Sequence, residues 1–307
     1  PKGDQFAHAH GIRAQKKSAC TAAPLCFFVA LYITMVYKSV IYALILVALV
    51  VLVVAVGDSC GGGWGTVRQQ AVGLFQKRKR APVVIFYHVA QIGDWMNIVN
   101  EQVSLLRTSG LYKKADRIMV TVLGSQPLEL PSKMEIVYRS NNLQEYEIVT
   151  INKMLEFSKS CTATHYILYL HTKGVTKRMC NGVHGQYYWR QLMNYWNVER
   201  HPDMIAALDK GYLTAGINLM KNTWGIDSFH YSGNFWWASS AHLSTLAPLS
   251  SHAQRWDAEF WLLTRRLPRR HISLYGPYVV SVNCSGLYGT VVERKTYEDA
   301  TQDTRVV

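Results

Sequence analysis

The sequence predicts an α/β domain built on a mostly parallel sheet flanked by helices, preceded by one N-terminal transmembrane helix. Three observations carry this prediction. From Pro82 onward, short apolar segments alternate with segments of helical periodicity, which implies crossover connections and a parallel sheet. Two of the apolar segments are continuous rather than alternating, as expected of strands that are buried on both faces. Residues 27–56 are apolar over the length that a helix needs to cross a bilayer.

Each element of the folded part follows from its own pattern. Val83–Tyr87 is a short apolar strand, and residues 95–107 then carry apolar side chains at helical spacing. Further strands are expected over 117–124, 133–139 and 165–171, and further helices over 145–158, 185–198 and 252–266. The helix over 145–158 is expected to bury one face, formed by Ile148, Ile151 and Leu155.

The N-terminal apolar segment, 27–56, is interrupted by Lys38 and a few small polar residues. A buried core helix and a cleaved signal peptide are the alternatives, but the apolar region of a signal peptide is only about 7–15 residues long. The length favours a single signal anchor. Basic residues precede it, which favours a cytosolic tail over 1–26 and a type II orientation, although the basic run at 77–80 on the far side argues against it. Those preceding residues are Lys2, Arg13, Lys16 and Lys17.

The composition narrows the function classes. Residues 57–81 are rich in glycine and basic side chains and are expected to form a flexible stem before the domain at 82–307. The chain has 33 Lys and Arg against 20 Asp and Glu, a net charge of +13, which suggests an anionic partner. The basic residues are dispersed and no recognition motif is present, so nucleic acid is disfavoured. The cysteine spacing matches no zinc pattern, and no Gly-x-Ser-x-Gly or His-Glu-x-x-His motif supports a hydrolase or zinc protease.

Polar residues follow two of the expected strands at the point where each ends. His88 follows the first strand, and His171, Lys173 and Gly174 stand at the end of the strand over 165–171. In an open parallel sheet, ligands bind beyond the carboxyl ends of the strands. A nucleoside diphosphate would suit a lysine and two hydrogen-bonding imidazoles.

The second half of the domain is rich in aromatic residues. The helix over 185–198 carries a core face of apolar side chains, and Arg190 lies off that face, where it could reach an anion. That core face consists of Trp189, Leu192, Met193 and Trp196. Gly233 and Asn234 indicate a turn or a close approach of the backbone. Trp236 and Trp237 point to opposite faces of a strand, so one can pack in the core while the other faces a pocket and stacks on a sugar. Plain core packing of both stays open.

The expected helix over 252–266 has an apolar stripe formed by Trp256, Phe260 and Leu263. Asp257 and Glu259 interrupt this segment in a chain with few acids. Solvent-exposed charge is the usual role of such residues. A carboxylate at a partly apolar site, however, has a raised pKa and can act as a base near neutral pH.

Six segments together resemble a family of GT-A-type glycosyltransferases and related proteins. They read FYHVAQIGDW, SGLY, YLHTKG, WRQLMNYW, HYSGNFWWA and WDAEFWL, and they span Val83 to about Tyr278. The resemblance implies a Rossmann-like GT-A fold with a single mixed sheet, a nucleotide-sugar donor, and transfer to a hydroxyl. It also implies that YLHTKG stands where most of these enzymes carry Asp-x-Asp, and that the catalytic acid lies within WDAEFWL.

This chain departs from that pattern, because it contains no Asp-x-Asp. That motif holds Mg²⁺ or Mn²⁺, which neutralises the diphosphate leaving group. His171 and Lys173 could supply the neutralisation directly. No metal ligand and no cofactor are therefore predicted, the nucleotide sugar being a substrate, and a role for Mg²⁺ or Mn²⁺ stays open.

The sequence thus predicts a membrane-anchored glycosyltransferase of the Golgi or endoplasmic reticulum that transfers a hexose or related sugar, with inversion favoured, to a glycan or glycoprotein. The alternative is an inactive module of the same fold that binds a glycan or nucleotide. Glu259 is the predicted base, with Asp257 in reserve, and it should lie away from His171 and Lys173. Trp236 and Trp237 are the predicted acceptor-binding residues. The predicted donor-binding residues are His88, His171, Lys173, Gly174, Arg190, Gly233 and Asn234.

Overall fold

The computed structural model describes residues 80–307 apart from 176–178, 181, 224–225, 251, 266–268, 277–285, 288 and 301–303. One folded unit spans Lys79–Val307. The predicted tail and transmembrane segment lie outside the described residues, as does the stem except for its last two positions. Within the described ranges, no helix has the length and apolar character needed to cross a membrane.

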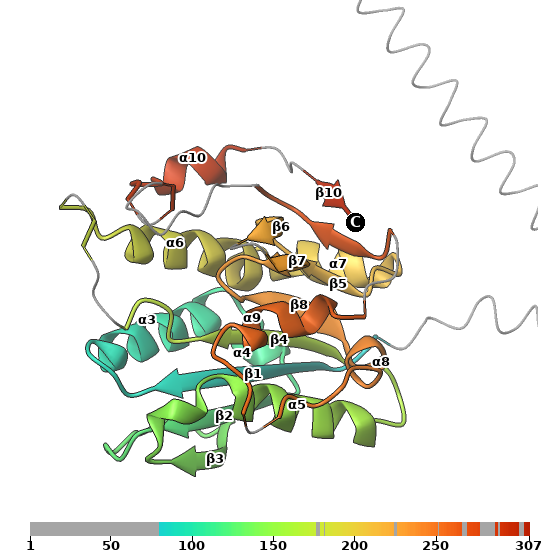
Figure 1. Ribbon diagram of the computed structural model, residues 1–307, viewed down its shortest axis with the longest axis horizontal. Coiled ribbons are helices and arrows are strands. Elements are labelled where there is room, and N and C mark those ends of the chain that lie inside the picture. The colour runs from blue at the N-terminus through green and yellow to red at the C-terminus, as the bar shows by residue number, and fades with distance from the viewer. Residues whose placement is uncertain are drawn as a thin grey trace, which may run out of the picture. The chain divides into compact units, whose positions relative to one another are not determined.

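The sheet is built outward from a central apolar strand (Figure 1). Strand β1 (Val83–Ala90) pairs in parallel with β2 (Arg117–Leu123) on one side and with β4 (Tyr166–His171) on the other. Strand β3 (Met134–Ser140) continues the parallel arrangement beyond β2 and forms one edge. The side chains of β1 are buried on both faces, which explains why its sequence is continuously apolar.

Beyond β4 the sheet becomes mixed. Strand β8 (Trp236–Ser239) is antiparallel to β4 and to β5 (Thr214–Gly216). Strand β9 (His271–Ser273) is parallel to β5, and β10 (Arg305–Val306) runs antiparallel at the far edge. Among the described residues the eight strands follow the order β10-β9-β5-β8-β4-β1-β2-β3. The predicted α/β architecture with a mostly parallel sheet flanked by helices is confirmed.

One face of the sheet is covered by helices that follow β1 and β4. These are α3 (Trp95–Thr108), α4 (Leu111–Lys114), α6 (Gly185–Asn194), the π-helical segment η2 (Tyr195–Glu199) and α7 (His201–Asp209). Their apolar side chains form one core with the residues of β1 that share the parity of Ile85 and Tyr87. A short helix, α10 (Arg294–Glu298), lies close to α6.

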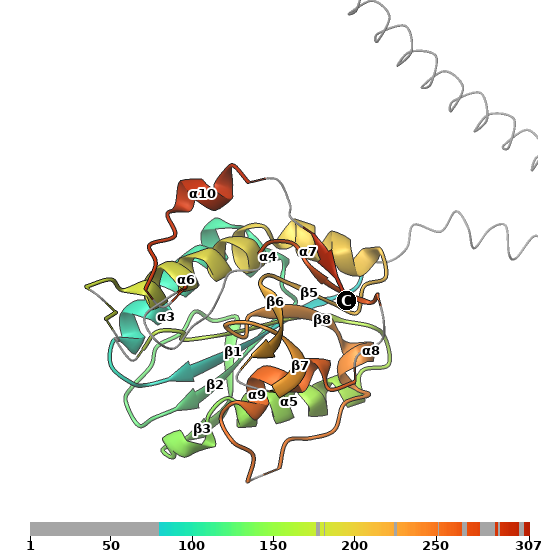
Figure 2. The same cartoon turned by 45° about the horizontal axis from the view of Figure 1, so that its top comes forward.

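The opposite face is covered by α5 (Ile148–Ser160), α8 (Ser240–Leu243), α9 (Asp257–Phe260) and the 3₁₀ segment η3 (Trp261–Leu263). A two-stranded hairpin, β6 (Leu219–Thr223) with β7 (Ile226–Tyr231), packs there as well. Figure 2 shows β7, α9 and α5 gathered on this side. The second core contains the other parity of β1, represented by Val84 and Phe86.

Several element boundaries differ from the predictions. The helix expected over 145–158 is split: η1 (Leu143–Glu145) comes first, Tyr146 adopts a positive φ of 48°, and α5 begins only at Ile148. The predicted buried face of α5 is confirmed. The helix expected over 252–266 is wrong in length, since only α9 and η3 form. Asp257 accepts a hydrogen bond from the N–H of Gln254 (2.7 Å), which closes a turn before the helix begins.

Candidate functional site

The carboxyl ends of β1 and β4 lie side by side, as the sequence predicts. His88 and His171 are register partners, and both side chains lie on the α5 side of the sheet. The chain then leaves β4 tied to β1, because the N–H of Thr172 donates to the carbonyl of His88 (3.1 Å) and its hydroxyl accepts from the N–H of Ala90 (3.1 Å). These bonds fix the backbone that carries Lys173.

His171 is held by two acceptors. Its Nδ1 lies 3.0 Å from Oε1 of Glu147, and its Nε2 lies 3.1 Å from the carbonyl oxygen of Gly233. A carboxylate and a carbonyl both accept, so these two contacts engage both ring nitrogens as donors. Burial raises the pKa of Glu147, but the charge and the hydrogen bond of His171 outweigh this effect and hold the pKa at about 2.

This arrangement corrects the expectation that His171 donates to a diphosphate. Neither ring nitrogen remains for a ligand, because each already has a protein acceptor. The side chain instead joins the start of α5, through Glu147, to the turn at Gly233. His171 therefore positions the edge of the site rather than reaching across it.

His88 is enclosed between the sheet and α5. Its Nδ1 lies 2.8 Å from Oγ1 of Thr150 and 3.3 Å from Oγ1 of Thr121. Burial lowers the pKa of His88 to about 4, so the imidazole is neutral at neutral pH. A neutral, buried imidazole supplies no charge to a diphosphate, and the structure does not place His88 at a ligand-accessible surface.

Lys173 is the predicted site residue whose charge remains available. Its Nζ lies 4.1 Å from the ring centroid of Trp189, a cation–π geometry. In the part of the chain that the structure describes, this ammonium has no hydrogen bond or ion pair. Burial lowers the pKa of Lys173, while the charges of Glu259 and Glu147 act to raise it. The three ammonium donors can thus serve a ligand.

Arg190 is buried and paired. Its Nε and Nη2 donate to the two carboxylate oxygens of Glu101 at 3.0 and 2.9 Å, and its Nη1 donates to the carbonyl of Lys173 at 3.0 Å. Glu101 therefore neutralises the guanidinium that the sequence assigned to an anionic ligand. In this structure Arg190 helps to fix the backbone of Lys173 through its carbonyl oxygen.

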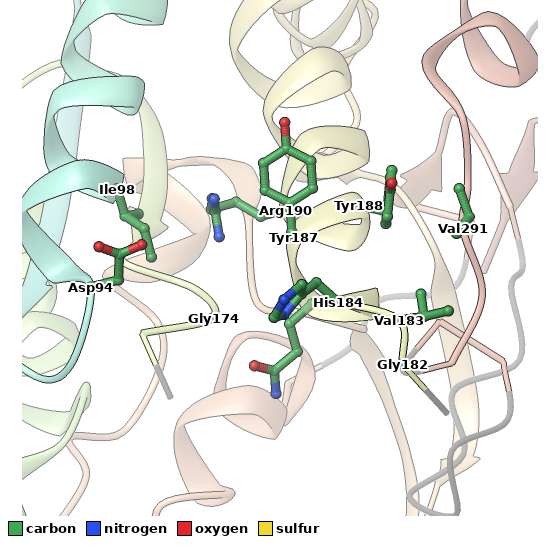
Figure 3. A pocket seen from close by; sticks show the side chains of 11 residues that line it. Asp94, Ile98, Gly174, Gly182, Val183, His184, Tyr187, Tyr188, Arg190 and Val291 are labelled. Carbon is green, nitrogen blue, oxygen red and sulfur yellow. The ribbon is translucent and has the colours of Figure 1, made fainter. Parts of the chain in front are cut away.

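A cavity of about 430 Å³ lies beside this backbone, on the α3 and α6 side. Its wall includes Asp94 and Ile98 from the beginning of α3, and Tyr187 and Arg190 from α6. Figure 3 shows the side chains of Asp94 and Ile98 facing that of Arg190. Among the predicted site residues, Gly174 and Arg190 line this cavity. Its volume is that of a site for a small organic ligand.

The two predicted acids of α9 lie in different surroundings. Glu259 is partly buried, and its charge is the largest influence that raises the pKa of Lys173. Asp257 is exposed, and its carboxylate accepts the N–H of Gln254. The choice between the two acids thus has a geometric basis. Glu259 acts electrostatically on Lys173, and the expectation that the base lies on the other side of the sugar from that ammonium stays a prediction.

The predicted turn between the aromatic runs is confirmed. Gly233 has a φ of +94° and Asn234 a φ of +60°, and the N–H of Asn234 donates to the carbonyl of Tyr231 at 2.9 Å. The backbone also approaches α6 closely, since a Cβ at Gly233 would lie 2.3 Å from the sulfur of Met193. Only glycine fits at this point.

Trp236 and Trp237 point to opposite faces of β8, and both are buried, with 1% and 0% of their surface exposed. The indole N–H of Trp236 donates to Oδ1 of Asn234 at 2.8 Å, and that of Trp237 donates to the carbonyl of Asn197 at 2.9 Å. The expectation that one of them faces a pocket and stacks on an acceptor is corrected. Both are core residues in this structure.

Sequence reasoning missed several residues of this region. Glu147 and Glu101 bind His171 and Arg190, and Tyr169 and His230 end in buried polar atoms beside Lys173 and Glu259. A usable signal existed for Glu147, because acids are scarce in the chain and this one precedes an apolar helical segment. His230 is the first residue of the HYSGNFWWA segment, but no role of its own was predicted for it.

In the described ranges, no group of three His, Cys, Asp or Glu side chains is arranged to hold a metal ion. Cys161 is a free thiol, and Cys180 is disulfide-bonded. No protein-family model matches this chain, and no curated protein sequence is significantly similar to it.

Proposed function

We propose that this chain is a membrane-anchored glycosyltransferase that moves a sugar from a nucleotide-sugar donor to a hydroxyl of a glycan or glycoprotein. One observation carries the proposal. An ammonium without a protein partner among the described residues, Lys173, follows the carboxyl end of β4, and the charge of a partly buried carboxylate, Glu259, acts to raise its pKa. Ligands bind at this edge in open α/β sheets.

The pair supplies the two charges that sugar transfer with inversion requires. The acceptor oxygen attacks the anomeric carbon, the bond from that carbon to the diphosphate oxygen breaks, and the acceptor proton passes to a carboxylate. Glu259 is the proposed proton acceptor. Lys173 is the proposed partner of the negative charge that develops on the leaving diphosphate.

The form of the sheet supports the finer fold assignment. An antiparallel strand, β8, lies inside an otherwise parallel region, between β4 and β5. The resemblance in the sequence implies a single mixed sheet of this general kind. We therefore assign the domain to the GT-A type as part of the same proposal.

The placement in the secretory pathway is also part of the proposal. The anchor over 27–56 stays a prediction from the sequence, since it lies outside the described residues. The disulfide of Cys180 supports a lumenal domain, because disulfides persist mainly in oxidising compartments. Both features point to a type II protein of the Golgi or endoplasmic reticulum.

The test is the release of free nucleoside diphosphate from a panel of UDP- and GDP-linked sugars by the purified full chain. Turnover of one donor, dependent on an added glycan, is the expected result. If Lys173 replaces the metal, the chain should keep its activity in EDTA. Complete loss of activity in EDTA that Mn²⁺ restores would contradict metal independence, but not the transferase activity. Binding of a sugar nucleotide without any turnover would favour the alternative, an inactive binding module.

A further inference from the structure

Three buried side chains near Lys173 and Glu259 end in polar atoms without a hydrogen-bond partner among the described residues. These atoms are the hydroxyl of Tyr169, both ring nitrogens of His230, and Nδ2 of Asn234. The three residues are 0%, 1% and 1% exposed. Folded proteins rarely leave buried polar atoms unpaired, because each one has lost its contacts with water. These four atoms are therefore candidates for contacts with a ligand.

Tyr169 and Asn234, which together with His230 are referred to below as the polar cluster, are joined through Trp236. The ring of Tyr169 lies 5.2 Å from that of Trp236. The indole N–H of Trp236 donates to Oδ1 of Asn234, so Nδ2 is the side-chain atom of Asn234 that has no partner among the described residues. The ring of His230 lies 4.8 Å from that of Phe260, the neighbour of Glu259. The cluster thus draws on β4, β7, the turn before β8, and α9.

Electrostatic influence connects the polar cluster with the proposed catalytic pair. Burial raises the pKa of the Tyr169 hydroxyl, and the charges of Glu147 and Glu259 raise it further. Burial, with a smaller effect of the Lys173 charge, lowers the pKa of His230 to about 4. At neutral pH the cluster itself is therefore uncharged, although it lies next to a cation and a carboxylate.

The hydrogen-bonding capacity of the polar cluster defines the chemistry of its ligand. A neutral imidazole offers one donor and one acceptor, a phenol can donate or accept, and the amide nitrogen of Asn234 donates. A hydroxyl group both donates and accepts, so a ring carrying several hydroxyls matches this mixture. An anion such as phosphate would leave the acceptor nitrogen of His230 unpaired. A ligand with hydroxyls on adjacent carbons is the better match.

We infer that Tyr169, His230 and Asn234 recognise hydroxyl groups of the sugar ring that lies between Lys173 and Glu259. The inference rests on the proposed function, since it assigns the transferred sugar to this place. It makes these three residues determinants of which sugar is accepted. It also replaces Trp236 and Trp237, the residues that the sequence predicted to contact a sugar, with side chains close to them.

The test compares two tyrosines in the same half of the core. Tyr169 has a buried hydroxyl without a partner among the described residues, whereas the hydroxyl of Tyr231 contacts Oγ1 of Thr214 (2.8 Å) and the carbonyl of Ile272 (2.9 Å). The full chain in detergent and its Tyr169→Phe and Tyr231→Phe variants are titrated with a panel of free monosaccharides by saturation-transfer NMR. Melting temperatures are recorded for each.

The expected result is a split between the two variants. Tyr169→Phe weakens monosaccharide binding by about tenfold, the effect of losing one hydrogen bond in a buried site, and leaves the melting temperature unchanged or higher. Tyr231→Phe lowers the melting temperature and leaves monosaccharide affinity unchanged. His230→Phe, a second change within the cluster, weakens binding as well.

Three results would overturn the inference. They are the absence of monosaccharide binding by the unmodified chain, equal affinity in Tyr169→Phe, and competition by inorganic phosphate that persists in Lys173→Ala, which would reveal an anion site at the polar cluster itself. If only water occupies the polar cluster, the unmodified chain will not bind monosaccharides, which is the first of these results. The proposed function fails separately: monosaccharide binding through Tyr169 without any diphosphate release leaves the inference intact and removes the transferase assignment.

Discussion

Glu259 and Asp257 lie two positions apart, yet their surroundings predict different consequences of mutation. Glu259→Gln keeps the shape of the side chain and removes the base, so donor binding should persist while kcat falls by about 10²–10⁴. Asp257→Asn is the matched control, because this carboxylate is exposed and bonded to Gln254. It should keep nearly normal turnover. The measurement is kcat for both variants, with donor affinity by calorimetry.

If Asp257→Asn lowers kcat and Glu259→Gln does not, Asp257 is the catalytic base. Near-normal turnover in both variants would instead favour a retaining mechanism that needs neither acid. In either case the role of Glu259 would be to stabilise the charge of the Lys173 ammonium, and not to accept a proton.

Lys173 should bind the diphosphate only while it is protonated. Lys173→Ala is expected to weaken nucleoside diphosphate binding by roughly 10- to 150-fold, from the loss of about 1.5–3 kcal/mol, with little effect on the free nucleoside. Burial lowers the pKa of Lys173, so affinity in the unmodified chain should fall as the pH rises through that lowered value. In Glu259→Gln the fall should begin at lower pH, because a charge that raises the pKa is removed.

Calorimetric titration with the nucleoside diphosphate over a series of alkaline pH values measures this dependence. Equal losses of nucleoside and diphosphate affinity in Lys173→Ala would show that this residue does not touch phosphate. A midpoint that is the same with and without Glu259 would show that the two side chains are not coupled.

At the residue scale, the sequence located the right strand ends but not the roles of the side chains there. His171, Lys173 and Gly174 could be found because polar residues end an apolar strand abruptly. That His171 is held by Glu147 depends on where α5 begins, in the element that precedes β4. Such partnerships between distant segments leave no mark in a local pattern, so His171 was assigned to the ligand.

At the element scale, the turn between β7 and β8 depends on glycine for two separate reasons. Gly233→Ala places a methyl group at a φ of +94° and 2.3 Å from the sulfur of Met193. Gly211→Ala is the matched control, with a φ of +95° and no atom within 4 Å of the added Cβ. Gly233→Ala should therefore lower the melting temperature more than Gly211→Ala, and should also weaken ligand binding, since the turn carries Asn234. Equal losses in the two variants would mean that backbone strain alone decides.

The elements themselves were predictable to different degrees. Strands β1, β2 and β4 were found because they are largely buried and apolar, whereas β3 is an edge strand in which only Met134 is buried. The helix over 252–266 was overestimated, because its apolar spacing included Trp256, which is 53% exposed in the structure. An aromatic residue at helical spacing cannot by itself distinguish a packed face from an exposed one.

On the scale of the whole molecule, buried neutral histidines make stability depend on pH. His88 and His230 have a folded pKa of about 4, below the unfolded value of about 6.5. The unfolded chain therefore binds more protons between these values, and the free energy of unfolding should fall as the pH drops from 6.5 to 4, on the order of 3 kcal/mol for each histidine. Glu147, with a folded pKa of about 2, adds a further loss below pH 4.5.

Urea denaturation at pH 7.5 and pH 5 measures the first of these losses. His230→Phe should flatten the dependence, because one of the two depressed groups is removed. Unchanged midpoints between the two pH values in the unmodified chain would show that these imidazoles have the same pKa in the folded and the unfolded chain.

The boundary of the folded unit leads to a second prediction at this scale. A chain beginning at Arg80 should fold and remain monodisperse without detergent, because the unit that starts at Lys79 contains the whole sheet. Gel filtration and circular dichroism provide the measurement. If the shortened chain aggregates, and only a chain that includes residues 27–56 stays in solution, the apolar segment belongs to the core.

The antiparallel strand has a consequence for the biosynthesis of the protein. β4 pairs with β1 on one side and with β8 on the other. β1 is synthesised before β4, whereas β8 leaves the ribosome only after α6, α7 and the β6–β7 hairpin. Until Trp236–Ser239 emerges, the apolar edge of β4 offers unpaired N–H and C=O groups to any neighbouring nascent chain. Chains that stall or are truncated before Trp236 should therefore aggregate during synthesis, and the growing polypeptide should depend on chaperones for that interval.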